Sequence, residues 1–324
     1  MNYLCKFPKQ ILMLAVGIAL GPYAFNLIAP QILEVSADLR QVALVIILIR
    51  AGLSLDINDL RRIGRPAVLM CFIPATIEIA ATVVLAPLFF GISHIEAAIM
   101  GAVLAAVSPA VVVPRMIGLM ESGYGKGKGI PQLIMAGTSV NGVFVIVLFT
   151  LFMGIAGDGG FDFAGAARTS LVPLLGFVMA IVLGNTVLKK RKILAGQVSR
   201  GLAWIWIPAE IMLFVLVGAT VNIQYAMNEG FASVGLIFAV LVVRFAGTLA
   251  CLLKTKLNTK ERIFCGIAYT PKATVQAAIG ATPLIVGIAA GGTILTVAVV
   301  AILVTAPLGA IGIDVLYKKT LEVE

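Results

Sequence analysis

Long hydrophobic runs alternate with short polar segments along the whole chain. A helix of about 20 apolar residues is long enough to cross a bilayer core of about 30 Å. The windows between polar breaks give ten such runs, at about residues 11–29, 40–55, 66–91, 95–118, 130–156, 165–187, 203–223, 231–253, 263–286 and 293–316. The pattern predicts an all-α, polytopic membrane protein with about ten spans in a single transmembrane domain, residues 1–324.

Two of these runs are interrupted in the middle by proline and hydroxyl residues, in matching places of the two halves. The first break contains Ser108 and Pro109, and the second contains Thr270, Pro271 and Lys272. Non-helical backbone is tolerated at membrane depth only where protein or a water-filled cavity surrounds it. A matched pair of interrupted spans is typical of transporters built from inverted repeats, with a binding site near the midplane. We therefore expect two broken helices that cross at a polar site.

The charged residues lie mainly in the loops, and every second loop is basic. Charged residues make up 12% of the chain and the net charge is +9, against 60% hydrophobic residues. The positive-inside rule then places both termini in the cytoplasm of a multi-pass inner-membrane protein. The same rule accounts for the basic balance without a nucleic-acid partner. The apolar run after Lys6 and Lys9 lacks a small-residue cleavage site and is predicted to be a span, not a signal peptide.

A few ionisable side chains lie deep inside predicted spans, where each costs roughly 2.5–3.5 kcal/mol on insertion scales. Glu78 and Arg244 lie near the middle of their spans, each in the run that precedes a break. They are expected to pair, either as a charge pair that tunes an ion site or as a structural salt bridge between two helices. Lys272 is expected to neutralise the carbonyl end of a half-helix.

Oxygen-bearing side chains at the breaks suggest a site for a small monovalent cation. Ser108 and Thr270, together with freed backbone carbonyls, offer the oxygen ligands that hard cations prefer. Glu210, near the start of its run, is interpreted as an interfacial residue or a partner of Lys272. The four cysteines have no metal-ligand spacing and no Ser/His/Asp set is evident, so neither an enzyme nor a resident cofactor or metal is expected.

Four stretches resemble bacterial members of the monovalent cation:proton antiporter superfamily, in its sodium/proton exchanger branch. They are Arg50-Ala51-Gly52-Leu53-Ser54-Leu55, Ala106 to Pro114, Gly129-Ile130-Pro131 and Pro271 to Ala278. The resemblance implies a sodium/proton antiporter-like fold and exchange of Na⁺ or Li⁺ for H⁺ by alternating access. It further implies core helices at about 66–156 and 231–316, and panel helices at about 11–55 and 165–223, and is compatible with a homodimer.

By the same resemblance, Glu78 and Arg244 match the family's buried acid–arginine pair, and Lys272 matches the lysine after the second break. The family's ion site is an adjacent Asp-Asp or Asn-Asp pair on the helix after the first broken one. The matching stretch here contains Thr138, Ser139, Asn141 and Gly142.

Asn141 fits the first position of that pair, but Gly142 removes the carboxylate for which proton and cation compete. Glu78 is then the best remaining proton carrier. The alternatives are a non-transporting paralogue, or a partner subunit of a full-length exchanger, with a passive channel ranked last.

The chain is also shorter than the family pattern. It is expected to lack one N-terminal helix and about two spans between residues 156 and 203. An even number of missing internal spans preserves the alternation of basic loops. The reduction would fall on the panel and leave both halves of the core complete.

Overall fold

The structure is a computed structural model that describes residues 8–54, 61, 63–156, 175–176, 178–188 and 192–323. Within these residues every regular element is a helix, as the hydrophobic pattern predicts. The elements are α1 (Lys9–Leu20), α2 (Pro30–Glu34), α3 (Ser36–Ser54), α5 (Arg65–Phe90), α6 (His94–Ala105), α7 (Pro109–Glu121), α8 (Ile130–Ala156), the π-helical turn η1 (Gly184–Leu188), α10 (Lys192–Ala219), α11 (Ile223–Cys251), α12 (Thr259–Ala268), α13 (Thr274–Ile279), α14 (Thr282–Ile285) and α15 (Gly291–Thr320).

Among the described residues, six helical segments are long and apolar enough to cross a membrane: α5, α6 with α7, α8, α10, α11 and α15. The expected span at 263–286 appears instead as three short helices, α12, α13 and α14, separated by non-helical residues. The expected span at 40–55 corresponds to α3, which begins four residues earlier, at Ser36. The expected span at 165–187 falls mostly outside the described residues.

The first expected span, 11–29, is wrong in its extent. Helix α1 ends at Leu20 because Gly21 adopts an extended conformation and Pro22 follows it. A second helix then starts only at Pro30. The hydrophobic run continues through this turn, so hydropathy alone overestimates the helix by nine residues.

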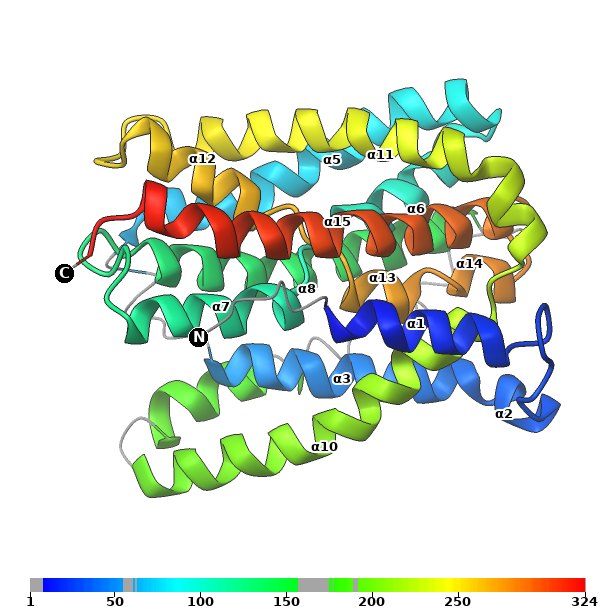
Figure 1. Cartoon of the computed structure of the whole chain (residues 1–324), viewed down its shortest axis with the longest axis horizontal. Coiled ribbons are helices and arrows are strands. Elements are labelled where there is room, and N and C mark those ends of the chain that lie inside the picture. Colours follow the sequence, from blue (N-terminus) through cyan, green and yellow to red (C-terminus); the bar gives the residue numbers. More distant parts are fainter. Residues whose placement is uncertain are drawn as a thin grey trace.

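The helices form layers that Figure 1 shows in one view. Helix α5 lies beside α11, α6 packs on α8, and α15 lies along α11. Helices α1, α3 and α10 form a separate layer on the other side of α15, where α10 packs against both α1 and α3. Small residues let α1 and α10 approach closely, since a β-carbon added at Gly21 would lie 2.7 Å from the Ala219 carbonyl oxygen.

The two broken helices meet at their breaks. The first break spans residues 106–108, between α6 and α7, and the second spans residues 269–273, between α12 and α13. A proline disfavours helical conformation in the residue before it, and Ser108 and Thr270 both precede one. The Ser108 amide donates a hydrogen bond to the Pro271 carbonyl at 2.8 Å. This backbone contact fastens one interrupted helix to the other.

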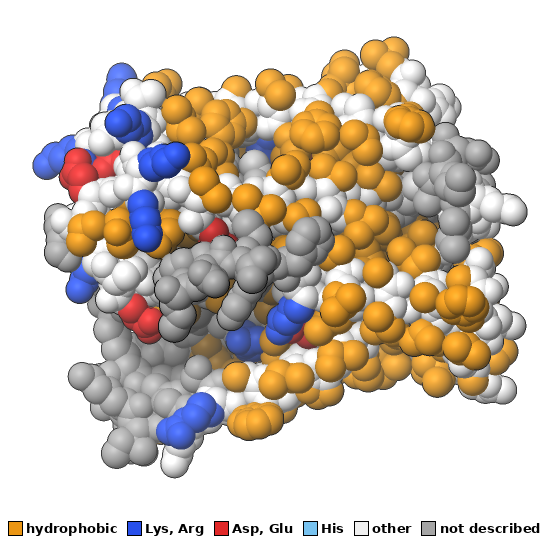
Figure 2. Space-filling view, in the orientation of Figure 1, with side chains coloured by type: hydrophobic (Ala, Val, Ile, Leu, Met, Phe, Trp, Pro, Cys, Tyr) orange, Lys and Arg blue, Asp and Glu red, His pale blue; other side chains and the backbone are white. Residues whose placement is uncertain are grey.

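Apolar and charged side chains lie in different regions of the surface. Figure 2 shows hydrophobic side chains covering most of the visible face, while Lys and Arg gather toward the end that carries α12 and the C-terminus. This is the distribution expected of a protein that spans a bilayer.

Candidate ion-binding site at the crossing of the broken helices

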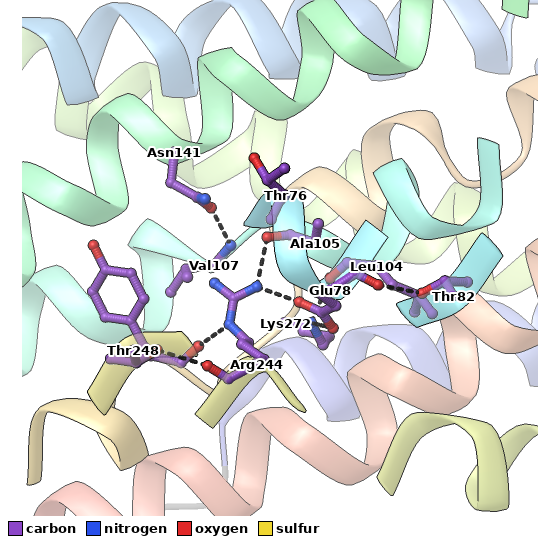
Figure 3. Close-up of polar contacts among 12 residues, drawn as sticks. Thr76, Glu78, Thr82, Leu104, Ala105, Val107, Asn141, Arg244, Thr248 and Lys272 are labelled. Atoms are coloured by element: carbon purple, nitrogen blue, oxygen red, sulfur yellow. Dashed lines mark hydrogen bonds and ion pairs between the residues drawn. The ribbon is translucent and has the colours of Figure 1, made fainter. Parts of the chain in front are cut away.

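Three charged side chains meet beside the crossing. Glu78 of α5 is fully buried, and Arg244 of α11 and Lys272 of the second break are each 1% exposed. The Arg244 Nη1 atom donates to Glu78 Oε2, and the Lys272 Nζ atom donates to Glu78 Oε1 at 2.6 Å (Figure 3). One carboxylate therefore serves two cations, and the cluster carries a formal charge of +1.

The two cations also bind the carbonyl ends of both half-helices. Arg244 donates through Nη1 to the Ala105 carbonyl at 2.8 Å and through Nε to the Tyr269 carbonyl at 3.0 Å. Lys272 Nζ donates to the Leu104 carbonyl. The last carbonyls of a helix lack intrahelical partners and carry partial negative charge. Arg244 and Lys272 therefore stabilise the ends of α6 and α12 and are not held by Glu78 alone.

A further residue of this network was not singled out from the sequence. The Gln276 Nε2 atom donates to the carbonyls of Val103 and Ala106, at 3.0 and 2.9 Å, and more weakly to that of Leu104, at 3.3 Å. Gln276 is fully buried. Its signal in the sequence is an uncharged amide one turn after the second break in an otherwise apolar stretch.

Asn141 holds the first break from α8. Its Oδ1 accepts a hydrogen bond from the Val107 amide at 3.0 Å, and its Nδ2 donates to the Cys71 carbonyl at 3.4 Å. Asn141 therefore satisfies a backbone donor that the break leaves free. Next to it, a β-carbon added at Gly142 would meet only Val275 Cγ2, at 3.9 Å, so the backbone leaves room for a side chain.

The hydroxyl groups proposed as cation ligands are engaged locally. Thr138 and Ser139 donate to carbonyls one turn back in α8, at 2.7 and 2.9 Å. Thr270 Oγ1 likewise donates to the Ile267 carbonyl at 2.8 Å. Ser108 Oγ lies 3.4 Å from Thr274 Oγ1, which joins the two breaks through side chains.

Pro109 is the first residue of α7, where its missing amide proton costs nothing. Pro271 contributes its carbonyl to the crossing through the hydrogen bond from Ser108. Both prolines therefore shape the breaks.

Glu210 does not belong to this cluster, contrary to one interpretation of the sequence. It is 1% exposed on α10 and accepts hydrogen bonds from Lys9 Nζ at 2.6 Å and Gln10 Nε2 at 2.8 Å, both near the start of α1. Among the described residues, Lys272 pairs with Glu78 and not with Glu210.

Two interrupted helices that cross around buried charges are typical of the folds of secondary transporters. A family model described as "Sodium/hydrogen exchanger, transmembrane" matches residues 4–202 and 177–319. The chain belongs to this family of transmembrane sodium/hydrogen exchangers.

Relatives and solved structures agree with this assignment. The chain is 32% identical to sodium/hydrogen exchanger 9B2 of Mus musculus over 349 positions, covering 89% of this chain and 63% of that protein. It is 31% identical to sodium/hydrogen exchanger 9B1 of Homo sapiens over 346 positions, covering 88% and 67%. The sodium proton antiporter MjNhaP1 of Methanocaldococcus jannaschii at pH 8 shares the fold with a TM-score of 0.79 at 17% identity, over 94% of this chain and 93% of that one.

The chain spans less than two thirds of the length of the murine exchanger. Since 89% of the chain is about 288 residues, about 60 of the 349 aligned positions have no residue opposite them here. Two spans of about 20 residues with their loops would fill such a gap. The loss of two spans between residues 156 and 203 stays a prediction, because the positions of the unmatched residues are not fixed by these numbers.

Proposed function

We propose that this protein is a secondary transporter that exchanges a monovalent cation, Na⁺ or Li⁺, for protons by alternating access. The observation that carries the proposal is the buried carboxylate of Glu78, which lies beside the crossing and holds Lys272 by an ion pair of 2.6 Å. A midplane carboxylate that can release one cation and accept another is the minimum requirement for exchange.

The exchange step follows from the charges of the cluster. When Lys272 gives up its proton, its neutral amine no longer balances Glu78, and Glu78 Oε1 becomes available to a metal cation. Binding of Na⁺ or Li⁺ then replaces the charge that the proton carried, so the cluster keeps its formal +1. Reprotonation of Lys272 expels the cation. In this proposal Lys272 bears the proton and Glu78 is the carboxylate that the proton-bearing lysine and the metal cation share. This differs from the expectation from the sequence, which made Glu78 the proton carrier. Arg244 holds the other carboxylate oxygen in place.

A flux measurement tests this assignment. Purified protein in proteoliposomes should show proton flux driven by a Na⁺ or Li⁺ gradient, and Glu78→Gln should abolish it. Glu210→Gln is a matched control, because Glu210 is an equally buried acid that lies away from the crossing and pairs with Lys9. Absence of flux in the wild type, or equal flux in both variants, would refute exchange at Glu78.

The second candidate is a non-transporting paralogue or a partner of a full-length exchanger. It is favoured by Gly142, which supplies no carboxylate, and by the engagement of both Glu78 oxygens with cations. In that case the wild type is inactive, and Asn141→Asp with Gly142→Asp should restore cation-dependent flux. The space beside Gly142 accommodates the added side chain. Flux in the wild type would reject this candidate.

Placement in the inner membrane with both termini in the cytoplasm belongs to the same proposal, and the alternation of basic loops supports it. Assembly as a homodimer is proposed through the layer of α1, α3 and α10. Its outer side exposes large apolar residues, including Trp204 at 73% and Leu12 at 69%. Cross-linking between cysteines introduced at Trp204 in native membranes would detect the dimer.

A further inference from the structure

A basic cavity lies at the charged end of the core, apart from the crossing. Its volume is about 450 Å³, within the range of roughly 300–1,000 Å³ found for small-molecule sites. The lining comes from the start of α5, the loop before α8, the first turn of α8 and the loop between α11 and α12. It thus joins the three helices that carry Glu78, Asn141 and Arg244 at one end.

The charged side chains that line the cavity are all positive. Five cationic side chains line it: Arg65, Lys126, Lys128, Lys254 and Lys256. Among the described residues that line it, none is acidic. Like charges gathered around a cavity raise the local concentration of anions.

Not all of these cations are neutralised by the protein. Lys128 Nζ lies 2.8 Å from Glu261 Oε1 and 3.1 Å from Glu322 Oε2, so two neighbouring carboxylates balance it. In the described part of the chain, the side chains of Lys126, Lys254 and Lys256 form no hydrogen bond or ion pair. Three ammonium groups at one cavity therefore remain available to a ligand.

Backbone features add to the attraction for an anion. The N-termini of α5 and α8, helices of 26 and 27 residues, both begin at the cavity. Gly64 caps α5 without a side-chain hydrogen bond, and Gly129 precedes α8 at φ 66°. Most of the first amides are already used, since Ala67, Ile130 and Leu133 donate to loop carbonyls and the second residue of each helix is a proline. The two helix ends therefore contribute mainly partial positive charge. The loop before α8 contains four glycines in alternation, Gly123, Gly125, Gly127 and Gly129, which the transport site does not use.

One more group lacks a partner. The side-chain oxygen of Gln132, in the first turn of α8, is buried with no hydrogen-bond partner in the described part of the chain. A buried amide oxygen left without a donor is costly. Because this oxygen is shut off from water, a ligand in the open cavity does not reach it, and Gln132 is not counted among the ligand-binding groups.

We propose that this cavity binds a phosphate-bearing anion of small-molecule size, either a soluble phosphate compound or the headgroup of an anionic phospholipid. The side chains of the three free lysines bind the phosphate, and the partial positive charge of the two helix N-termini adds to the attraction. Because the cavity joins α5, α8 and the link from α11 to α12, an occupied site stabilises the core against separation of these helices. This site does not depend on whether the protein transports cations.

The first arm of the test uses a soluble probe. Thermal unfolding of the full-length protein in detergent is measured with inorganic pyrophosphate and with chloride at equal ionic strength, since screening alone acts over about 8 Å at physiological salt. A soluble ligand site raises the unfolding temperature with pyrophosphate only. Lys126→Gln with Lys256→Gln should weaken the apparent affinity about thirtyfold, from about fivefold per lysine.

The second arm uses lipid. The protein is reconstituted in vesicles of phosphatidylcholine with or without phosphatidylglycerol, extracted, and examined by native mass spectrometry for retained phosphatidylglycerol. Retention that is lost in the double variant identifies the headgroup as the ligand.

The matched control is Lys260→Gln with Lys319→Gln, which removes two exposed lysines from the same end of the protein but outside the cavity. All four substituted lysines are exposed, so folding should be preserved. The proposal is overturned if neither probe binds, or if the two double variants lose binding equally.

Discussion

Replacement of Glu78 by glutamine should be the most damaging single change in the core. The change keeps the size of the side chain but removes the only acid bound to Arg244 and Lys272 in the described structure. Both cations are buried, so neither can recover its hydration without opening the core. The formal charge of the cluster rises from +1 to +2.

The expected cost follows from the burial of the two partners. Removing one member of a buried ion pair typically costs about 3–5 kcal/mol, because an uncompensated charge is left behind. Lys272→Met leaves a different net charge. Glu78 still pairs with Arg244, so the formal charge of the cluster falls from +1 to zero. It loses charge-assisted hydrogen bonds worth about 1.5–3 kcal/mol, offset by the removal of a buried cation. The Leu104 carbonyl that Lys272 leaves is still bound by Gln276.

The assay is a double-mutant cycle on thermal unfolding of the purified protein. For soluble domains of 150–250 residues, 1 kcal/mol corresponds to about 2–4 °C. Glu78→Gln should therefore lower the unfolding temperature by roughly 6–20 °C, and Lys272→Met by much less. The double variant should lie between them, because removal of Lys272 relieves part of the excess positive charge.

One result would refute the reasoning. If the loss in the double variant equalled the sum of the two single losses, Glu78 and Lys272 would act independently and Glu78 would not be the partner of Lys272.

Two other predictions concern packing and pH. Gly137→Ala should destabilise the protein by about 1–3 kcal/mol, because its methyl group would overlap the buried hydroxyl of Tyr269. Gly142→Ala should instead be neutral or stabilise by up to about 1 kcal/mol, because its methyl group has room and alanine is the better helix former. Thermal unfolding of the two variants compares a tight with an open site on one helix. A hydrogen bond with Glu261 raises the pKa of Lys128. The stability from this contact is therefore complete below the ordinary lysine pKa of about 10.4 and lost as the pH rises through the raised value. Lys128→Met should remove this alkaline step from the pH profile of unfolding temperature, and an unchanged step would exclude Lys128 as its source.

The sequence predicts the helix breaks well where proline and hydroxyl residues mark them. It predicts helix ends less well where only hydropathy is available. Proline and hydroxyl residues at residues 108–109 and 270–271 mark the two breaks, because proline restricts its own backbone and that of the preceding residue. The end of α1 at Leu20 was missed, since the residues after Gly21 remain apolar although they no longer form a helix. An apolar run predicts burial in lipid, but the turn within it depends on one glycine and one proline.

The candidate site shows the same division. Depth in an apolar run predicted that Glu78 and Arg244 would be buried, and the structure brings them together. Whether Lys272 binds Glu78 or Glu210 depends on which helices are neighbours, and the amino-acid sequence alone does not show which helices are in contact. Gln276 was missed for a similar reason: its amide matters only because three carbonyls of the other half of the chain lie within reach.

The geometry also explains how the crossing can persist without a carboxylate at position 142. Arg244 and Lys272 bind two kinds of group there, the carboxylate of Glu78 and backbone carbonyls. Arg244 and Lys272 bind carbonyl groups at the ends of α6 and α12, which exist whatever residue follows Asn141. Glu78 supplies the remaining negative charge from a third helix. These contacts do not need an acid at position 142, although Arg244 Nη2 has no hydrogen-bond partner among the described residues. We therefore expect that Gly142→Asp changes ion binding without removing the contacts that hold the two breaks together.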